Sequence, residues 1–286
     1  MKRSPSARQP VLKHVANLWT LTGQPSEKQE WTLEEKFKEA KRAGFQAIAT
    51  GASPEAAALC QKYGMDYVCY MDANVGNYRK RLEGARAINP ARCFVQLCDH
   101  DTSPGEAVKI WLKMETRAKE LGLELDLEVH RDTCTETPEK VLEIAVLYER
   151  ATRGKIRFCW DFSHLAVVKH LNPPYADRLL DRPDLVRLAR HFHLRPFNGH
   201  HCQIPATDGK GHEAPELKPF LEFVDALFAC WLKGAKGGEV VYTCPEFGPR
   251  ISGYGLAAFP NAWEDAMFLR KRTEAIWNLN LTRWGK

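Results

Sequence analysis

LELDLEVH (123–130) and KIRFCWDFSH (155–164) are apolar segments of strand length, and TPEKVLEIAVLYERA (137–151) lies between them with the apolar periodicity of a helix. Thr137 and Pro138 mark the start of this helix, because Thr is a good N-cap and Pro suits the first turn. The strands are apolar on both faces, which is typical of a parallel sheet covered by helices. This stretch therefore reads as a β-α-β unit.

The same unit repeats along the chain in both directions. The predicted strands are 11–19, 45–50, 65–73, 91–100, 123–130, 155–164, 191–197 and 239–248. The predicted helices are 31–44, 53–64, 78–88, 103–122, 137–151, 182–189, 215–234 and 261–279. This rhythm predicts an α/β fold, a single (β/α)8 TIM barrel over 11–286 that follows a disordered leader at 1–10. An open doubly wound sheet is the alternative, but no Gly-rich phosphate loop follows the first strand.

Composition limits the function classes. Hydrophobic residues make up 44% and charged residues 27% of the 286 positions, as in an ordinary soluble globular protein. The formal charge of +5 is spread along the chain and does not demand a nucleic-acid partner. The nine Cys form no CxxC pair, and several lie in apolar strands, which predicts reduced thiols and a cytoplasmic protein. No segment resembles a signal peptide or a membrane span.

A polar side chain of metal-binding type occurs at or near the end of each of the last four predicted strands. The carboxyl ends of barrel strands meet at one mouth, so these groups can converge on a single cation. Three carboxylates and one imidazole favour Mn²⁺, with Mg²⁺ or Co²⁺ as alternatives. The competing interpretation is that they are helix caps and surface charges. The predicted metal ligands are Glu128, Asp161, His193 and Glu246, with His191 replacing His193 if the strand register shifts by two.

The motifs LEVHRD, WDFSHL, HFH and PEFG resemble those of the xylose isomerase-like superfamily of TIM barrels. The branch that they resemble most contains sugar isomerases and epimerases such as D-tagatose 3-epimerase and hydroxypyruvate isomerase. This resemblance implies one divalent metal held by the four ligands and proton transfer next to a ketone through a metal-stabilised enediolate. It also implies that Glu128 and Glu246 are the catalytic bases and that His164 binds substrate.

Other residues are candidates for contact with substrate. The epimerases carry an Arg six residues after the seventh-strand His, where this chain has Gly199, so Arg195 is the proposed substitute. The loop after this strand is long and rich in His, which suggests rebuilt substrate contacts. An aromatic ring at the mouth would pack against a sugar. The remaining candidates are Trp19, His100 and His200, with His130 and His201 as weaker ones.

Several functions fit the same four ligands. The first is an isomerase or epimerase of a keto-sugar or polyol-derived ketone, and the second is a lyase or dehydratase that expels a β-substituent. An endonuclease IV-like enzyme would need a three-zinc cluster whose extra His ligands are missing here. A non-catalytic sugar-binding barrel is a further alternative. The expected partner is a small carbohydrate, with no nucleic acid or membrane, and a homodimer or homotetramer is the expected assembly.

Overall fold

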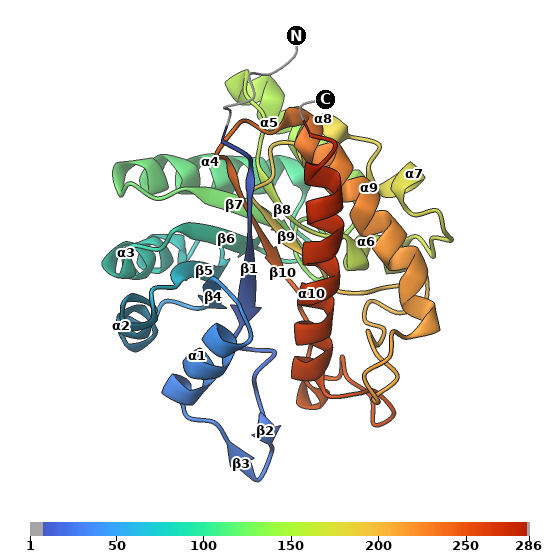
Figure 1. The fold of residues 1–286 in the computed structure, drawn as a ribbon. Coiled ribbons are helices and arrows are strands. Elements are labelled where there is room, and N and C mark those ends of the chain that lie inside the picture. The colour runs from blue at the N-terminus through green and yellow to red at the C-terminus, as the bar shows by residue number, and fades with distance from the viewer. Residues whose placement is uncertain (1–7, 285–286) are drawn as a thin grey trace.

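Eight parallel strands close into a barrel in the computed structural model, which describes residues 8–284 (Figure 1). Around the barrel the order is β1, β10, β9, β8, β7, β6, β5, β4, so every neighbour pair except the closing one is consecutive along the chain. This confirms the predicted TIM barrel. The strands are β1 (Val11–Asn17), β4 (Ala47–Thr50), β5 (Asp66–Ala73), β6 (Arg92–Leu97), β7 (Leu125–Val129), β8 (Phe158–Asp161), β9 (His191–His193) and β10 (Val240–Cys244).

Helices form the outer ring, and many begin where the sequence predicts. Thr32 and Ser103 each complete a capping box, while Ser53 and Thr137 cap through their hydroxyl oxygens. The helices are α1 (Leu33–Arg42), α2 (Pro54–Tyr63), α3 (Tyr78–Ile88), α4 (Pro104–Glu120), α5 (Pro138–Thr152), α6 (Phe162–Val168), α7 (Ala176–Leu179), α8 (Pro183–Val186), α9 (Lys218–Gly234) and α10 (Ala262–Leu281), with 3-10 turns at Pro215–Leu217 and Arg250–Ser252.

The structure corrects several predicted boundaries. The strand predicted to run to residue 164 ends at Asp161, because the Asp161 side chain accepts the backbone N–H of Ser163 and starts α6. A short antiparallel hairpin, β2 (Pro25–Ser26) with β3 (Gln29–Glu30), was not predicted and projects from the end of the barrel toward which β1 points (Figure 1). Of the predicted leader, residues 1–7 lie outside the described residues, and the Gln9 carbonyl accepts the N–H of Gly238.

The apolar core has two layers. The larger layer lies between the outer faces of the strands and the helices and contains most of the large apolar side chains. The smaller one fills the barrel interior with Val15, Ala47, Ala49, Val68, Phe94, Cys159, Tyr242 and Cys244. Small residues dominate this inner layer, since eight converging strands leave little space. No helix within residues 8–284 has the length and apolar character needed to cross a membrane.

Candidate metal centre and the cavity above it

The four predicted ligands meet at the carboxyl ends of neighbouring strands. His193 and Asp161 are paired in register at the ends of β9 and β8, and Glu246 follows β10 by two residues. His193 Nδ1 lies 3.0 Å from Glu128 Oε1 and 3.4 Å from Glu246 Oε2. Donor atoms of Asp161, His193 and Glu246 all lie within 4.8 Å of one another. All four residues are buried, so the helix-cap interpretation holds for Asp161 only as an additional role.

The donor set fits a divalent cation. Glu128 Oε2, Asp161 Oδ2 and both ring nitrogens of His193 are buried and lack hydrogen-bond partners among residues 8–284. Buried polar atoms without partners are costly, and cation coordination would satisfy them. With His193 deprotonated, as a metal ligand must be, Arg195 offsets one of the three carboxylate charges, which leaves two negative charges for a divalent ion to balance. Oxygen-rich coordination with one imidazole suits Mn²⁺ or Mg²⁺.

Arg195 is fully buried in this centre. Its Nη2 lies 2.5 Å from Glu246 Oε2 and 3.4 Å from Asp161 Oδ2. The guanidinium also stacks under the ring of Tyr254, with 4.4 Å between the guanidinium carbon and the ring centroid. Arg195 thus contacts two of the candidate ligands and lines the cavity that faces them.

Buried charges fix the ionisation of the centre. Burial by itself raises the pKa of Asp161, but Arg195 and His164 outweigh it and hold the pKa well below its usual range. The pKa of Glu246 is also lowered, because His193 and Arg195 outweigh burial. Burial opposes a charged His193, yet Cys159 and the carboxylates of Glu246 and Glu128 leave its pKa well above the usual value. Both acidic groups are therefore ready to bind a cation as carboxylates.

A cavity of about 260 Å³, called here the inner cavity, opens directly above the four ligands. Trp19, predicted to face the substrate, lines it and meets Tyr254 edge to face at a centroid distance of 5.5 Å. Tyr254 accepts a 2.6 Å hydrogen bond from Arg131 Nε across the mouth. The remaining lining residues are Asn17, Tyr70, Asp72, Phe94, Gln96, Glu128, His130, His193, Arg195 and Glu246.

Two glycines shape this region. A Cβ on Gly248 would lie 2.5 Å from Tyr254 Cβ and 2.6 Å from Trp19 Cη2, so only glycine lets these rings meet. A Cβ on Gly199 would lie 2.2 Å from the Leu171 carbonyl oxygen. Position 199 therefore has no room for a side chain in this backbone.

Two other histidines lie below or beside the cavity and do not line it. His164 Nε2 is 3.3 Å from Asp161 Oδ2, so His164, predicted to bind substrate, contacts a candidate metal ligand. His191 packs inside the barrel against the ring of Phe94, with centroids 5.2 Å apart. Burial and the neighbouring His193 keep the pKa of His191 well below its usual value. His193, one strand repeat further on, is the imidazole that faces the carboxylates.

His100 and His200 lie elsewhere, which corrects their prediction as contacts of the same ligand. His100 is exposed beyond the end of β6, and its Nδ1 pairs with Asp132 at 2.7 Å. His200 is exposed on the long loop after β9, where its backbone N–H donates to Asn198 Oδ1. His201 donates to the same oxygen. The side chains of His100 and His200 are both exposed, and neither lines the inner cavity.

Sequence reasoning missed three residues that shape the site. Asn17 donates through Nδ2 to Glu246 Oε1 at 2.7 Å and accepts the N–H of Trp19. A polar residue just before the predicted end of the first strand was a usable signal for Asn17. Gln96 lies near the end of β6 and offered the same signal. Tyr254 lies on a loop far from any predicted strand, and no local pattern indicates it.

Solved structures with the same architecture include several sugar-converting enzymes. D-allulose 3-epimerase from Methylomonas sp. has a TM-score of 0.59 at 15% identity, with 96% of this chain and 99% of that chain covered. A xylose isomerase-like TIM barrel protein from Mycobacterium smegmatis in complex with magnesium has 0.58 at 13%, covering 94% and 97%. The probable 3-DHS dehydratase AsbF from Bacillus anthracis has 0.56 at 13%, covering 92% and 98%.

No family model matches the chain, and no curated protein matches it. At these identities the structural similarity establishes the architecture. The chain thus has the fold of the xylose isomerase-like TIM barrels, the group that its four motifs resemble.

Proposed function

We propose that this protein is a metal-dependent isomerase or epimerase of a neutral keto-sugar or polyol-derived ketone. The observation that carries the proposal is the buried convergence of Glu128, Asp161, His193 and Glu246 below an open cavity, where Glu128 Oε2 makes no hydrogen bond to any residue between 8 and 284. Mn²⁺ is the proposed cation. When bound, it supplies positive charge that stabilises the negative charge developing on a substrate oxygen.

Glu128 is proposed as the base that removes the proton next to the carbonyl. Its Oε2 has no hydrogen-bond partner among the described residues, and the side chain lines the inner cavity. A carboxylate that lines the cavity with one oxygen free of hydrogen bonds is placed to accept a proton from a substrate. The proton would return to the same or the neighbouring carbon from a group on the other side of the cavity.

Glu246 is the group proposed for the opposite side, and its surroundings differ. Asn17 Nδ2 donates to Oε1 at 2.7 Å, and Arg195 Nη2 donates to Oε2 at 2.5 Å. These contacts orient the carboxylate. Burial raises the pKa of Glu246, but His193 and Arg195 outweigh burial and lower it. Trp19 and Tyr254 supply apolar surface for the C–H face of the substrate and exclude water.

The occupied oxygens of Glu246 also favour a second candidate, a lyase. Elimination needs one base next to the carbonyl and a proton for the departing β-substituent, and no second free carboxylate. The probable dehydratase with this fold has the same overall architecture. Arg131 and His130 line the cavity and are the groups that would face a leaving group.

Turnover in deuterated water separates the two candidates. The Mn²⁺-loaded protein is incubated with fructose, tagatose, sorbose and inosose, and the products are analysed by NMR and mass spectrometry. Isomerisation or epimerisation gives an isomer with solvent deuterium at carbon, whereas elimination gives a product lighter by one water.

Glu128→Gln is expected to lower kcat by about 10²–10⁴, the usual loss when a general base is removed. Asp177→Asn, an exposed carboxylate on α7, is the matched control and should leave turnover unchanged. If the loaded protein catalyses no hydrogen exchange next to any ketone, or if Glu128→Gln retains full activity, the proposed chemistry is wrong.

A further inference from the structure

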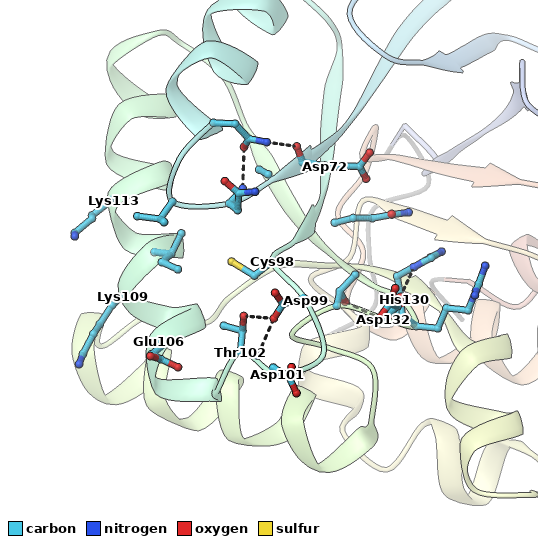
Figure 2. Close-up of a pocket in the computed structure, with 18 residues that line it drawn as sticks. Asp72, Cys98, Asp99, Asp101, Thr102, Glu106, Lys109, Lys113, His130 and Asp132 are labelled. Carbon is cyan, nitrogen blue, oxygen red and sulfur yellow. Dashed lines mark hydrogen bonds between the residues drawn. The ribbon is translucent and has the colours of Figure 1, made fainter.

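A second, larger cavity lies beside the inner cavity. It measures about 950 Å³ and is formed by the segments that follow β5, β6 and β7; we call it the outer groove (Figure 2). The two cavities share four lining residues, Asp72, Gln96, His130 and Arg131, so they adjoin each other at these side chains. A molecule held above the metal ligands would have to pass these four side chains to reach the outer groove.

The volumes indicate a ligand with more than one ring. The inner cavity, at about 260 Å³, is smaller than the roughly 300–1,000 Å³ of most small-molecule sites. The outer groove adds about 950 Å³ of adjoining space. A single sugar ring over the metal centre would leave the outer groove to solvent, whereas a two-ring molecule would occupy both cavities.

Two side chains at the junction are free to bind hydroxyl groups. Asp72 and Gln96 are partners in register on β5 and β6. Neither side chain makes a hydrogen bond to any residue between 8 and 284. A carboxylate accepts from two hydroxyls, while an amide both donates and accepts. Figure 2 shows Asp72 and His130 on one side of the groove and Lys109 and Lys113 on the other.

The charge of the groove selects the class of ligand. Its lining contains five carboxylates and three basic groups, and one of the carboxylates, Asp132, pairs with His100, so the lining keeps a small excess of negative charge. This negative balance disfavours a phosphorylated or carboxylated ligand. The N-terminus of α4, which borders the groove, is closed by the Ser103–Glu106 capping box. The charged lining residues are Asp72, Asp99, Asp101, Glu106, Asp132, Lys109, Lys113 and Arg131.

We infer that the outer groove binds the second sugar ring of a neutral keto-glycoside whose first ring reacts over the metal centre. Asp72 and Gln96 would bind hydroxyls of the second ring at the junction. This inference rests on the proposed function, because it assigns the reacting ketone to the inner cavity. It names the substrate class as glycosides with an unmodified, hydroxyl-rich second ring.

The test compares one-ring and two-ring ketoses on the Mn²⁺-loaded protein. The one-ring probes are fructose and tagatose, and the two-ring probes are lactulose, maltulose, isomaltulose and turanose. The wild type is expected to show at least about 10-fold higher kcat/KM for one or more two-ring probes, the size of effect that one or two charge-assisted hydrogen bonds provide. Calorimetric titration with the same sugars measures binding independently of turnover.

Two kinds of variant locate the effect. Asp72→Ala and Gln96→Ala should each lower the two-ring to one-ring ratio of kcat/KM by about 10-fold. Asp101→Trp adds a large ring at an exposed position of the groove away from the inner cavity, and it should lower the same ratio. Asp177→Ala, on the exposed face of α7, is the control and should leave the ratio unchanged. Thermal denaturation checks that each variant is folded.

The outcomes separate this inference from the proposed function. If the wild type converts ketoses but does not prefer two rings, or if the variants reduce both classes equally, the groove assignment is wrong and the proposed function stands. If nothing is converted, yet two-ring sugars bind and Asp72→Ala weakens that binding, the groove assignment stands and the proposed function is wrong. If no two-ring sugar is converted or bound, the groove assignment is wrong.

Discussion

The guanidinium of Arg195 connects the electrostatics of the site to the stability of the fold. It is 2% exposed and touches two carboxylates that are themselves buried. Burying charges is costly, and this arrangement is tolerable because opposite charges meet at short range. Removing the guanidinium would leave the carboxylates of Asp161 and Glu246 facing each other without its positive charge.

Arg195→Ala is therefore expected to lower the free energy of unfolding by about 3–5 kcal/mol in the metal-free protein. The loss should be smaller with Mn²⁺ present, because a bound cation again balances the carboxylates. Urea denaturation with EDTA and with Mn²⁺ measures both values. The control is Arg182→Ala, which breaks a partly exposed pair with Asp184 and should cost about 1 kcal/mol or less. An equal decrease in the free energy of unfolding for the two variants would show that Arg195 is not the counter-charge of the buried carboxylates.

His14 is a second residue whose burial has a measurable consequence. It lies between β1 and α10, near Thr243, and burial together with Arg270 lowers its pKa from 6.5 to about 3. Below pH 6.5 the unfolded chain binds a proton that the folded protein does not bind until about pH 3. The free energy of unfolding therefore falls as the pH decreases through this window.

From pH 7.5 to pH 5 this group should cost about 2 kcal/mol, at about 1.4 kcal/mol for each pH unit below 6.5. His14→Gln cannot take up the proton, so its free energy of unfolding should fall by about 2 kcal/mol less than that of the wild type. Urea denaturation at the two pH values tests this. The same pH dependence in both proteins would show that His14 does not titrate as its burial requires.

At the scale of elements, the loop after β9 packs closely against the segment that follows α6. The backbone of Gly199 packs on the carbonyl oxygen of Leu171, the residue that follows α6 by three positions. The chain between β9 and the turn at Pro215–Leu217 is thus fixed by contact with the preceding helical segment. A side chain at position 199 would push this loop away.

Gly199→Ala should lower the free energy of unfolding by about 1–3 kcal/mol, the usual cost of an added methyl group without space. Gly105 is the matched control, because it lies in α4 with nothing within 4 Å of an added Cβ. Gly105→Ala should raise the free energy of unfolding by about 0.5–1 kcal/mol. Denaturant unfolding of both variants measures the two changes in the free energy of unfolding, and these changes must have opposite signs.

At the scale of the whole molecule, a cation at the barrel mouth would link four consecutive strands. The ligands come from β7, β8, β9 and the segment after β10, so a bound ion would connect four of the eight barrel strands. A ligand that binds only the folded state raises the free energy of unfolding by about 2.7 kcal/mol at a concentration 100 times its Kd.

Mn²⁺ should therefore raise the Tm in proportion to the logarithm of its concentration, and EDTA should reverse the increase. Differential scanning calorimetry measures the effect. Asp161→Asn removes one ligand and should abolish the dependence, while Asp177→Asn on the exposed face of α7 should retain it. An Mn²⁺-dependent Tm that survives in Asp161→Asn would place the cation elsewhere.

Much of the architecture could be predicted from the sequence because its signals are local. The Ser–Pro and Thr–Pro pairs at 53–54, 103–104 and 137–138 start helices α2, α4 and α5 as expected. Strand boundaries were less accurate: Asp161 ends β8 through a side-chain contact that alternation of apolar residues does not reveal. For the same reason His100 was placed at a strand end to which β6 does not extend.

The order and hydrophobicity of its segments by themselves determined that this chain closes into a barrel, and that Glu128, Asp161, His193 and Glu246 lie at one mouth of it. These properties depend on periodicity and on the rule that parallel strands end together. Only the tertiary structure decided the partners across the mouth, such as Arg195 with Glu246 and Arg131 with Tyr254. Contacts between distant loops depend on backbone paths and close packing, which leave no periodic trace in the sequence.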